Sequence, residues 1–445
     1  MQKINKIKSM QKFNLFFLFF LTGLALLPAQ EANVVSVRFE TDYSIRDSVD
    51  NIGSKYIFYS SQHPSVFTFV NNNGSITVCS SDEKAKITYI YEFSMDLKQQ
   101  KTLNFPNEMD MLGAFTKDNE GNYYFFYGSR STNKNSKNMA MVKYNPDGKK
   151  VNTYTLEAQA PKSFDGIRVP FDAGTCRLEL SGSMLAVYFA REMFSGHQAS
   201  FGFVLDKDSF ARIDSGAATN DGKTGGVSEM PYTSHSFNQF ILPAEGGFIF
   251  ADHGDAYPRS FTFARFEKGK NTKRVHAFKF PGGIGANPTY AEMGGLAETS
   301  NGYIFTGAYG TDRNNPRNLF VINFDKEMGK CSSPLYLTKY TKENGHAGHP
   351  KIVALGSGRY LLLWELFAFS TQAANLIVQS STDYASTFYT VIDENGKILK
   401  DIGTLGTIRL NMNDVLRYNK QNGKAYWAIN DSSRSITLYA LDIGG

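Results

Sequence analysis

The sequence predicts an all-β fold built from repeated antiparallel sheets, and a phrase that recurs along the chain is the main reason. In this phrase a glycine-containing turn leads into a short run of aromatic and β-branched residues, as in 301–310, Asn-Gly-Tyr-Ile-Phe-Thr-Gly-Ala-Tyr-Gly. Glycine adopts the positive φ that tight hairpin turns need, and the residues that follow suit a pleated sheet. The sequence has no long stretch with apolar residues at helical spacing and no proline-rich linker.

The phrase occurs seven times, and subtraction places successive glycines 47 to 65 residues apart. The seven glycines are Gly74, Gly121, Gly182, Gly247, Gly302, Gly358 and Gly423. Five copies are followed by a second apolar run that ends in an acidic, Asn- or Gly-containing turn. These runs are 142–148, 202–208, 263–269, 320–326 and 390–396. One unit is therefore expected to hold two hairpins, or four strands, in roughly 58 residues.

A period of this length is typical of a β-propeller, in which each unit is one four-stranded sheet that cannot bury its faces alone. Seven blades fit residues 30–445, and six or eight are the alternatives because the longer intervals leave room for insertions. A strand-like run at 33–40 precedes the first full unit, and the last unit ends at 435–442. Since an open ring would leave unpaired edges, we expect the N-terminal strand to complete the blade that carries Gly423.

The repeat resembles that of secreted bacterial propellers of the kelch-, NHL- or WD40-like class over residues 33–445. The resemblance is to the seven-bladed class and identifies no specific family. No Trp-Asp dipeptide recurs, and only the Gly246-Gly247 pair leads into a repeat strand as a kelch pair would. A sialidase-type box occurs once in degraded form at 381–388. Trp364 and Trp427 are the only tryptophans, which excludes a quinoprotein docking girdle.

Residues 1–29 have the pattern of a signal peptide. Four lysines precede a mostly apolar run at 13–27, and Pro28-Ala29-Gln30 follows, so cleavage is expected after Ala29. The alternative is a membrane anchor, but a run of fifteen residues is short for a span of about 20. We therefore expect a single propeller domain at 30–445, secreted, periplasmic or at the cell surface, with no transmembrane segment after cleavage.

Charge and cysteine content exclude several classes of function. The chain has 47 basic and 42 acidic residues, and removal of the four leader lysines leaves 43 against 42. No basic cluster is interleaved with aromatic residues, so nucleic acid is not an expected partner. Cys79, Cys176 and Cys331 match no zinc spacing and are odd in number. They are expected to be small buried residues rather than a disulfide framework.

The middle of the chain departs most from the repeat, and it is where we expect the functional residues. The segments 191–198, 233–239 and 252–259 contain His197, His235 and His253. Loops of neighbouring blades converge on one face of a propeller, and the innermost strands line a central channel. His235 precedes a possible inner strand and is expected at the channel mouth. Corresponding positions in other blades are Asp110, Arg177, Glu292, His346, His349 and Asn413.

Two binding hypotheses compete with structural ones. Asp252, His253 and Asp255 are suitable ligands for a divalent cation, but aspartates also tie down irregular loops through backbone amides, and we favour that reading. No other cofactor is expected. The second hypothesis gives Arg177, Arg191 and Arg259, with the histidines, an anion or sugar-acid site, against ordinary ion pairs between blades.

We interpret the protein as a binding module rather than an enzyme, with loops of one face engaging an extracytoplasmic protein or glycan. The alternative is a glycan-active lyase or hydrolase in the central channel, with His235 and Glu292 as an acid/base pair. No Gly-x-Ser-x-Gly elbow supports a serine hydrolase. No residue is assigned as catalytic or as a metal ligand. The candidate ligand-binding residues are Arg177, His197, His235, Asp252, His253, Asp255, Arg259, Glu292 and His349.

Overall fold

The computed structural model describes residues 32–45, 65–159, 165–172, 174–216, 224–285, 289–369 and 383–444. These residues form strands and turns and no helix, so the all-β prediction is confirmed. It follows that no helix in this part of the chain is long and apolar enough to span a membrane. The predicted signal peptide, and the first two residues of the degraded sialidase-type box, lie outside the described residues.

All strand pairs in the described residues are antiparallel, and five sheets have four strands each. Four of these sheets follow the chain in order: β2(Val66–Val70), β3(Ile76–Asp82), β4(Ile87–Phe93) and β5(Gln99–Pro106); β6(Met111–Lys117), β7(Tyr123–Gly128), β8(Lys137–Tyr144) and β9(Lys150–Glu157); β19(Ala291–Glu298), β20(Gly302–Tyr309), β21(Asn318–Asp325) and β22(Leu335–Tyr336); β23(His346–Gly356), β24(Arg359–Phe367), β25(Tyr384–Asp393) and β26(Ile398–Gly406). The fifth joins both ends of the chain: β27(Arg417–Asn419), β28(Lys424–Ser432), β29(Ser435–Asp442) and β1(Asn33–Glu40).

The sixth sheet has nine strands and consists of two groups. The groups are β10(Val169–Pro170), β11(Cys176–Ser181), β12(Met184–Glu192) and β13(Gln198–Asp206), and β14(Thr224–Val227), β15(Ser234–Ala244), β16(Gly247–Ala256), β17(Arg259–Glu267) and β18(Asn271–Lys279). Only the pair Ala199–Ser234 joins β13 to β15. Counting these groups separately, we number seven blades among the described strands, in chain order from β2.

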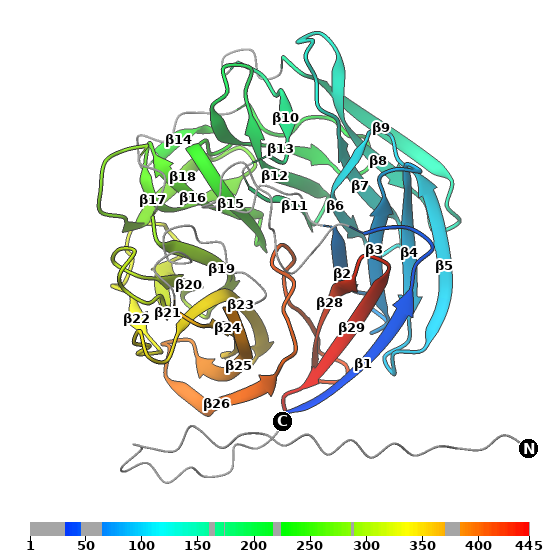
Figure 1. The fold of residues 1–445 in the computed structure, drawn as a ribbon. Helices are drawn as coiled ribbons and strands as arrows, with labels where there is room; N and C mark the ends of the chain where they lie inside the picture. The colour runs from blue at the N-terminus through cyan, green and yellow to red at the C-terminus, as the bar shows by residue number, and fades with distance from the viewer. Residues whose placement is uncertain are drawn as a thin grey trace, which may run out of the picture. The chain divides into compact units, whose positions relative to one another are not determined.

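The blades form a closed ring, as expected for a propeller. The first strands of the blades, β2, β6, β11, β15, β19, β23 and β27, contact one another in this cyclic order, and β27 contacts β2. Figure 1 shows β2, β6, β11, β15, β19 and β23 around the middle of the ring, and β1, β5, β9, β22 and β26 at its outer side. The start of one inner strand is therefore close to the starts of its neighbours, which brings residues far apart in sequence to one end of the channel.

The N-terminal strand closes the ring as predicted. β1 pairs with β29 along its whole length, from Asn33 opposite Asp442 to Glu40 opposite Ser435. Phe39 of β1 also contacts the first blade, with its ring centroid 4.7 Å from that of Tyr91 and 5.3 Å from that of Phe93. The strand therefore completes the seventh blade and packs against the first.

The recurring phrase marks the turn between the first and second strands of each blade, but glycine has two different reasons to be there. At Gly121 and Gly423 the backbone φ is +84° and +71°, as the sequence predicted. Gly247 and Gly302 open their strands without a positive φ. A Cβ at Gly247 would lie 1.9 Å from the Phe266 carbonyl oxygen, and one at Gly302 would lie 2.1 Å from that of Phe324. At these two positions glycine is required by close backbone approach.

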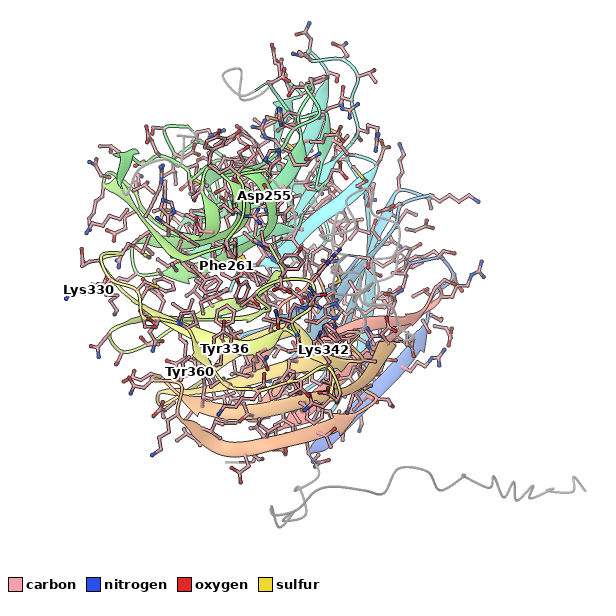
Figure 2. All side chains as sticks on the ribbon, turned by 60° about the vertical axis from the view of Figure 1, so that its left-hand side comes forward. Asp255, Phe261, Lys330, Tyr336, Lys342 and Tyr360 are labelled. Atoms are coloured by element: carbon pink, nitrogen blue, oxygen red, sulfur yellow. The ribbon has the colours of Figure 1, made fainter. Side chains whose placement is uncertain are left out.

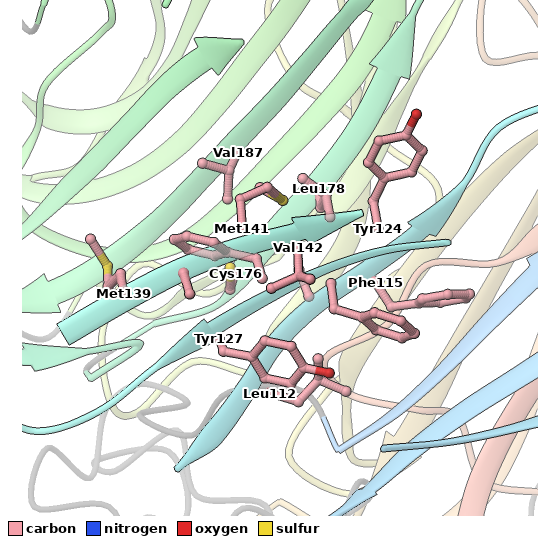
Figure 3. Packing of buried hydrophobic residues seen from close by; sticks show 14 of the residues in the cluster. Leu112, Phe115, Tyr124, Tyr127, Met139, Met141, Val142, Cys176, Leu178 and Val187 are labelled. Carbon is pink, nitrogen blue, oxygen red and sulfur yellow. The ribbon is translucent and has the colours of Figure 1, made fainter. Parts of the chain in front are cut away.

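Aromatic side chains fill the space between blades, which explains the abundance of Phe and Tyr. Phe126 of β7 lies 5.5 Å from Phe189 of β12 and 5.7 Å from Phe203 of β13, measured between ring centroids. Figure 3 shows the same cluster, with side chains of the second blade packed against Leu178 and Val187 of the third. Such rings bury large apolar areas between sheets. The aromatic residues are therefore packing residues in this cluster rather than a carbohydrate platform.

We predict that Phe39→Ala lowers the free energy of unfolding by about 1–3 kcal/mol, less than a fully buried Phe because the side chain is half-buried. Urea unfolding followed by fluorescence measures this. The matched control in the same strand is Val35→Ala, at a side chain that is 43% exposed. It should change stability by no more than about 0.5 kcal/mol. Equal effects of the two variants would show that the contact of β1 with the first blade is unimportant.

Candidate functional site

Two histidines stand at the start of inner strands in unusual backbone conformations. His235 of β15 has φ +48°, and His349 of β23 has φ +47°. Both lie beside irregularities in strand register, between Ser236 and Asn238 in one blade and between Gly348 and Lys351 in the other. Left-handed conformations are rare for non-glycine residues and occur preferentially at functional sites, and bulges re-aim side chains. The fourth and sixth blades therefore present a histidine in the same way at the same end of the channel.

His235 is backed by a buried carboxylate. Its Nδ1 lies 3.3 Å from Oδ1 of Asp255, and Nη1 of Arg259 lies 3.9 Å from Oδ2 of the same carboxylate. The His235 side chain is 22% exposed, whereas that of Asp255 is completely buried. Figure 2 labels Asp255 among the green strands of this part of the chain. The arrangement leaves an accessible imidazole whose inner edge faces a carboxylate.

The outer edge of His235 faces a second imidazole. His197, in the turn between β12 and β13, is exposed, and its Nδ1 lies 3.4 Å from Nε2 of His235. Burial, and then the neighbouring His197, lower the pKa of His235. The Asp255 carboxylate acts in the opposite direction, since it favours the protonated imidazole. At neutral pH His235 is therefore a neutral base.

His349 has a similar set of partners but is buried. Its Nδ1 lies 2.6 Å from Oε2 of Glu365, and Arg409 donates to Oε1 of that carboxylate at 2.9 Å. The backbone amide of Leu410 also donates to Oε1, at 2.7 Å. Burial opposes ionisation of Glu365, but His349 and Arg409 lower its pKa below the ordinary value. This carboxylate is therefore ionised and fully engaged by its neighbours.

The side chain of Glu292 on β19 contacts residues of both the fifth and the sixth blade. Its Oε1 accepts a hydrogen bond from the backbone amide of His349 at 3.1 Å, and its Oε2 lies 3.7 Å from Nη1 of Arg317. His346 is buried nearby, and burial followed by Arg317 lowers its pKa to about 2. The carboxylate that the structure places beside His235 is therefore Asp255, where the sequence suggested Glu292.

The predicted cation ligands do not converge. Asp252 accepts hydrogen bonds from Tyr188 at 2.7 Å and Ser236 at 2.6 Å, and burial raises its pKa to about 6. The neighbouring His253 has its Nε2 2.7 Å from Oγ1 of Thr289 and a pKa lowered to about 3 by burial. Asp255 faces His235 instead. Within the described ranges no group of three or more His, Cys, Asp or Glu residues is placed to hold a metal ion.

The arginines predicted to bind an anion are buried and bonded to the backbone. Arg177 donates to the Gln239 carbonyl at 2.9 Å and to the Asn413 carbonyl. Arg191 donates to the Gly166 carbonyl, and Arg259 donates to the Pro281 carbonyl at 3.0 Å. The structural alternative for these arginines was ion pairs between blades, whereas these partners are backbone carbonyl groups. Through these hydrogen bonds the three guanidinium groups hold neighbouring backbone segments in place.

A cavity of about 650 Å³ occupies the other end of the channel, where the inner strands end. Apolar side chains from four blades and from the segment that leads into β27 line much of it, among them Phe69, Phe240, Leu296, Ile352 and Leu416. One ion pair lies in the wall, where Nη2 of Arg417 is 3.0 Å from Oε1 of Glu179. Nothing in the sequence predicted this cavity, and none of the candidate ligand-binding residues lines it.

Glu365, Arg409 and Lys351 were not predicted from the sequence either. A signal for Glu365 was present, since it is the only charge in the otherwise apolar run 360–367, Tyr-Leu-Leu-Leu-Trp-Glu-Leu-Phe. A charge in a buried strand has to be paired, so it indicates partners elsewhere in the fold. Arg409 carries no such signal because it lies in a segment between strands.

A scan against protein-family models finds no match for the chain, and a search of curated proteins finds none either. Among solved structures the GH93 α-L-arabinofuranosidase of Fusarium graminearum is 11% identical, with a TM-score of 0.42, over 89% of this chain and 97% of that one. A Trypanosoma rangeli sialidase is 10% identical, with a TM-score of 0.40, over 80% and 59%. A prolyl endopeptidase is 10% identical, with a TM-score of 0.43, and the chain spans only 47% of its length.

The expectation that this protein is a binding module rather than an enzyme is wrong. The three structural neighbours are all enzymes: an arabinofuranosidase, a sialidase and a prolyl endopeptidase. The resemblance to kelch-, NHL- or WD40-like proteins holds only as a propeller fold. With identities of 10–11% and TM-scores below 0.5, the likenesses indicate no substrate and no reaction for this chain. Its chemistry has to follow from its own residues.

The lowered pKa of His253 predicts how the stability of the fold changes at acid pH. Since its pKa is about 3 in the fold and about 6.5 when unfolded, the unfolded chain binds more protons between these values. The contribution of His253 is present above pH 6.5 and lost as the pH falls toward 3. We predict that His253→Gln is less stable at pH 7 but loses stability less steeply on acidification, as measured by urea unfolding.

The raised pKa of Asp252 has the opposite effect, since it makes the fold lose stability as the pH rises from about 3.8 to 6. Asp252 is present in both proteins, so the comparison isolates His253. The control is His276→Gln, at a half-buried histidine of the outer strand β18. Equal slopes for wild type and His253→Gln would contradict the assignment.

Proposed function

We propose that this protein is a glycan-cleaving enzyme that acts outside the cytoplasm, with His235 as its proton-transfer group. The observation that carries the proposal is the accessible imidazole backed by the buried Asp255 carboxylate, 3.3 Å from Nδ1. A carboxylate in this position orients the imidazole, selects its tautomer and stabilises the protonated form. The proposed location outside the cytoplasm rests on residues 1–29, which have the pattern of a signal peptide. The proposed glycan substrate follows the alternative interpretation of the sequence, a glycan-active lyase or hydrolase.

The geometry favours elimination over hydrolysis. Most glycoside hydrolases use two carboxyl groups that both reach the scissile bond. At this end of the channel Asp255 and Glu365 are completely buried, and Glu292 accepts the amide of His349. A lyase instead needs a base that removes the proton next to a uronic acid carboxyl group, and the neutral His235 has the required properties. The proposed substrate is therefore a glycan that contains uronic acid.

We predict that His235→Gln lowers cleavage of the responsive glycan by at least about 100-fold, because the amide cannot accept the proton. The assay incubates the purified protein with a panel of uronic acid polysaccharides and follows both the absorbance of unsaturated products and the release of reducing ends. His276→Gln is the matched control, since this histidine lies on the outer strand of the same blade. It should keep wild-type activity.

Two outcomes would change the proposal. Reducing ends that form without unsaturated product would identify a hydrolase, and wild-type protein that cleaves no polysaccharide of the panel would overturn the proposed function. A His235→Gln variant that folds and retains full activity would move the chemistry to another residue.

The lowered pKa of His235 also predicts a pH profile. A base works in its deprotonated form, so kcat/KM should stay constant as the pH falls to about 6.5, the ordinary histidine value, and decline only below it. Asp255→Asn removes the charge that favours the protonated imidazole, so the decline should move to still lower pH while the plateau drops. A decline that begins above pH 6.5 in the wild type would show that His235 is not the base.

A further inference from the structure

The segment 407–416, which we call the strap, connects β26 to β27 by way of the middle of the ring. Figure 1 draws it as the orange trace that rises into the channel between the last two blades. Asn411 donates from Nδ2 to the carbonyls of Val66 and Ala428, both at 2.9 Å. Oδ2 of Asp414 accepts the backbone amide of Thr68 at 2.7 Å. The strap is therefore bound to the first and last blades.

Two basic side chains from other blades hold three successive carbonyl groups of the strap. Nζ of Lys351 on β23 donates to Met412 at 3.0 Å and to Asp414 at 2.7 Å. Arg177 on β11 donates to the carbonyl of Asn413, between them. Both side chains are buried. A neutral amine has two N–H groups, and the structure gives Lys351 two carbonyl acceptors.

The strap also reaches the end of the channel where the candidate site lies. Arg409 and the amide of Leu410 both bind the Glu365 carboxylate that contacts His349. On the opposite side, Val415 and Leu416 form part of the wall of the 650 Å³ cavity. The strap therefore lies between the two ends of the channel.

We propose that the strap is an acid-released latch, which closes the channel while Lys351 is a neutral amine and loosens when Lys351 takes up a proton. Loosening moves the carbonyls of residues 412–414 away and lets the ammonium group reach water. The buried charge is then relieved by solvation rather than by a partner. This property is independent of the proposed reaction.

Burial of Lys351 and the neighbouring Arg177 set the direction of the switch, and the nearby carboxylates oppose it. Arg177 of β11, Asp414 of the strap, Glu292 of β19 and Glu365 of β24 act on it. Burial, and then Arg177, lower the pKa of Lys351 to about 7, against the effect of the three carboxylates. A lysine in the loosened, solvated state has its ordinary pKa of about 10.4. Between these two values the loosened state binds more protons, so acidification favours it.

Hydrogen exchange of the full chain between pH 6 and 10 tests the latch. The rate in the strap is divided by the rate of the unfolded peptide at each pH, which removes the intrinsic base catalysis. We expect the protection of residues 409–415 to rise by up to about tenfold per pH unit from pH 7 toward 10, and to be constant below 7. Wild-type protection that does not change between pH 7 and 10 would overturn the proposal.

Two variants assign the effect to Lys351. Lys351→Met has no titrating group and Lys351→Arg stays charged, so the pH dependence should vanish in both. If one fails to fold, the other still decides the question. Lys117→Arg is the control, since Lys117 is a buried lysine paired with Glu92 at 2.8 Å in the second and first blades. It should keep the wild-type slope, and an unchanged slope in either Lys351 variant would refute the assignment.

Discussion

The pairing of β1 with β29 is the contact on which the rest of the structure depends. Every other blade is made from consecutive strands, whereas the seventh needs a strand from the far end of the chain. Without it, β29 would present an open edge and the first and seventh blades would lose a shared face. The inner strands hold their places around the channel only because the ring is closed. The site at the strand starts, assembled from several blades, therefore depends on a pairing at the periphery.

Inside that ring, buried charged groups are stabilised by their contacts with one another. Each of the two left-handed histidines faces a carboxylate from the second strand of its own blade, and an arginine faces that carboxylate in turn. Removing any one member would leave a charge in a poorly solvated place, which is costly. The difference between the two sets is exposure. The set around His235 reaches solvent and can meet a substrate, whereas the set around His349 stays inside and holds the strap.

Much of the architecture could be predicted from the sequence because it repeats. Turn glycines and aromatic strands are local signals, so the strand type, the four-stranded unit and the closure by the N-terminal strand followed from residues 33–442. The site was harder, because its partners come together only through the ring. His235 was placed at the channel end, but nothing near it in sequence indicates that Asp255 is the carboxylate it faces. Lys351 looks like an ordinary strand lysine until the strap lies against it.

Gly247 and Gly302 show a further limit. From its place in the repeat, glycine is expected only as a turn former, but these two are required because a neighbouring carbonyl lies where a Cβ would be. Close approach between strands is a property of the assembled sheet, so composition and spacing do not reveal it. His253 is a comparable case: it was a candidate ligand by sequence, and its burial beside Phe261 and Phe280 is a property of the packed blade.

The backbone pair Ala199–Ser234 makes the third and fourth blades one continuous sheet, while the other described neighbours touch without sharing one. The pair stands immediately beside His197 and His235. Both imidazoles therefore lie next to the hydrogen-bonded pair that joins the two blades. We expect movement at other blade boundaries to change the distance between them little. The spacing of the imidazoles is in this sense a mechanical property of one sheet. Groups that reach the same end from the fifth and sixth blades are mounted separately and can shift relative to it.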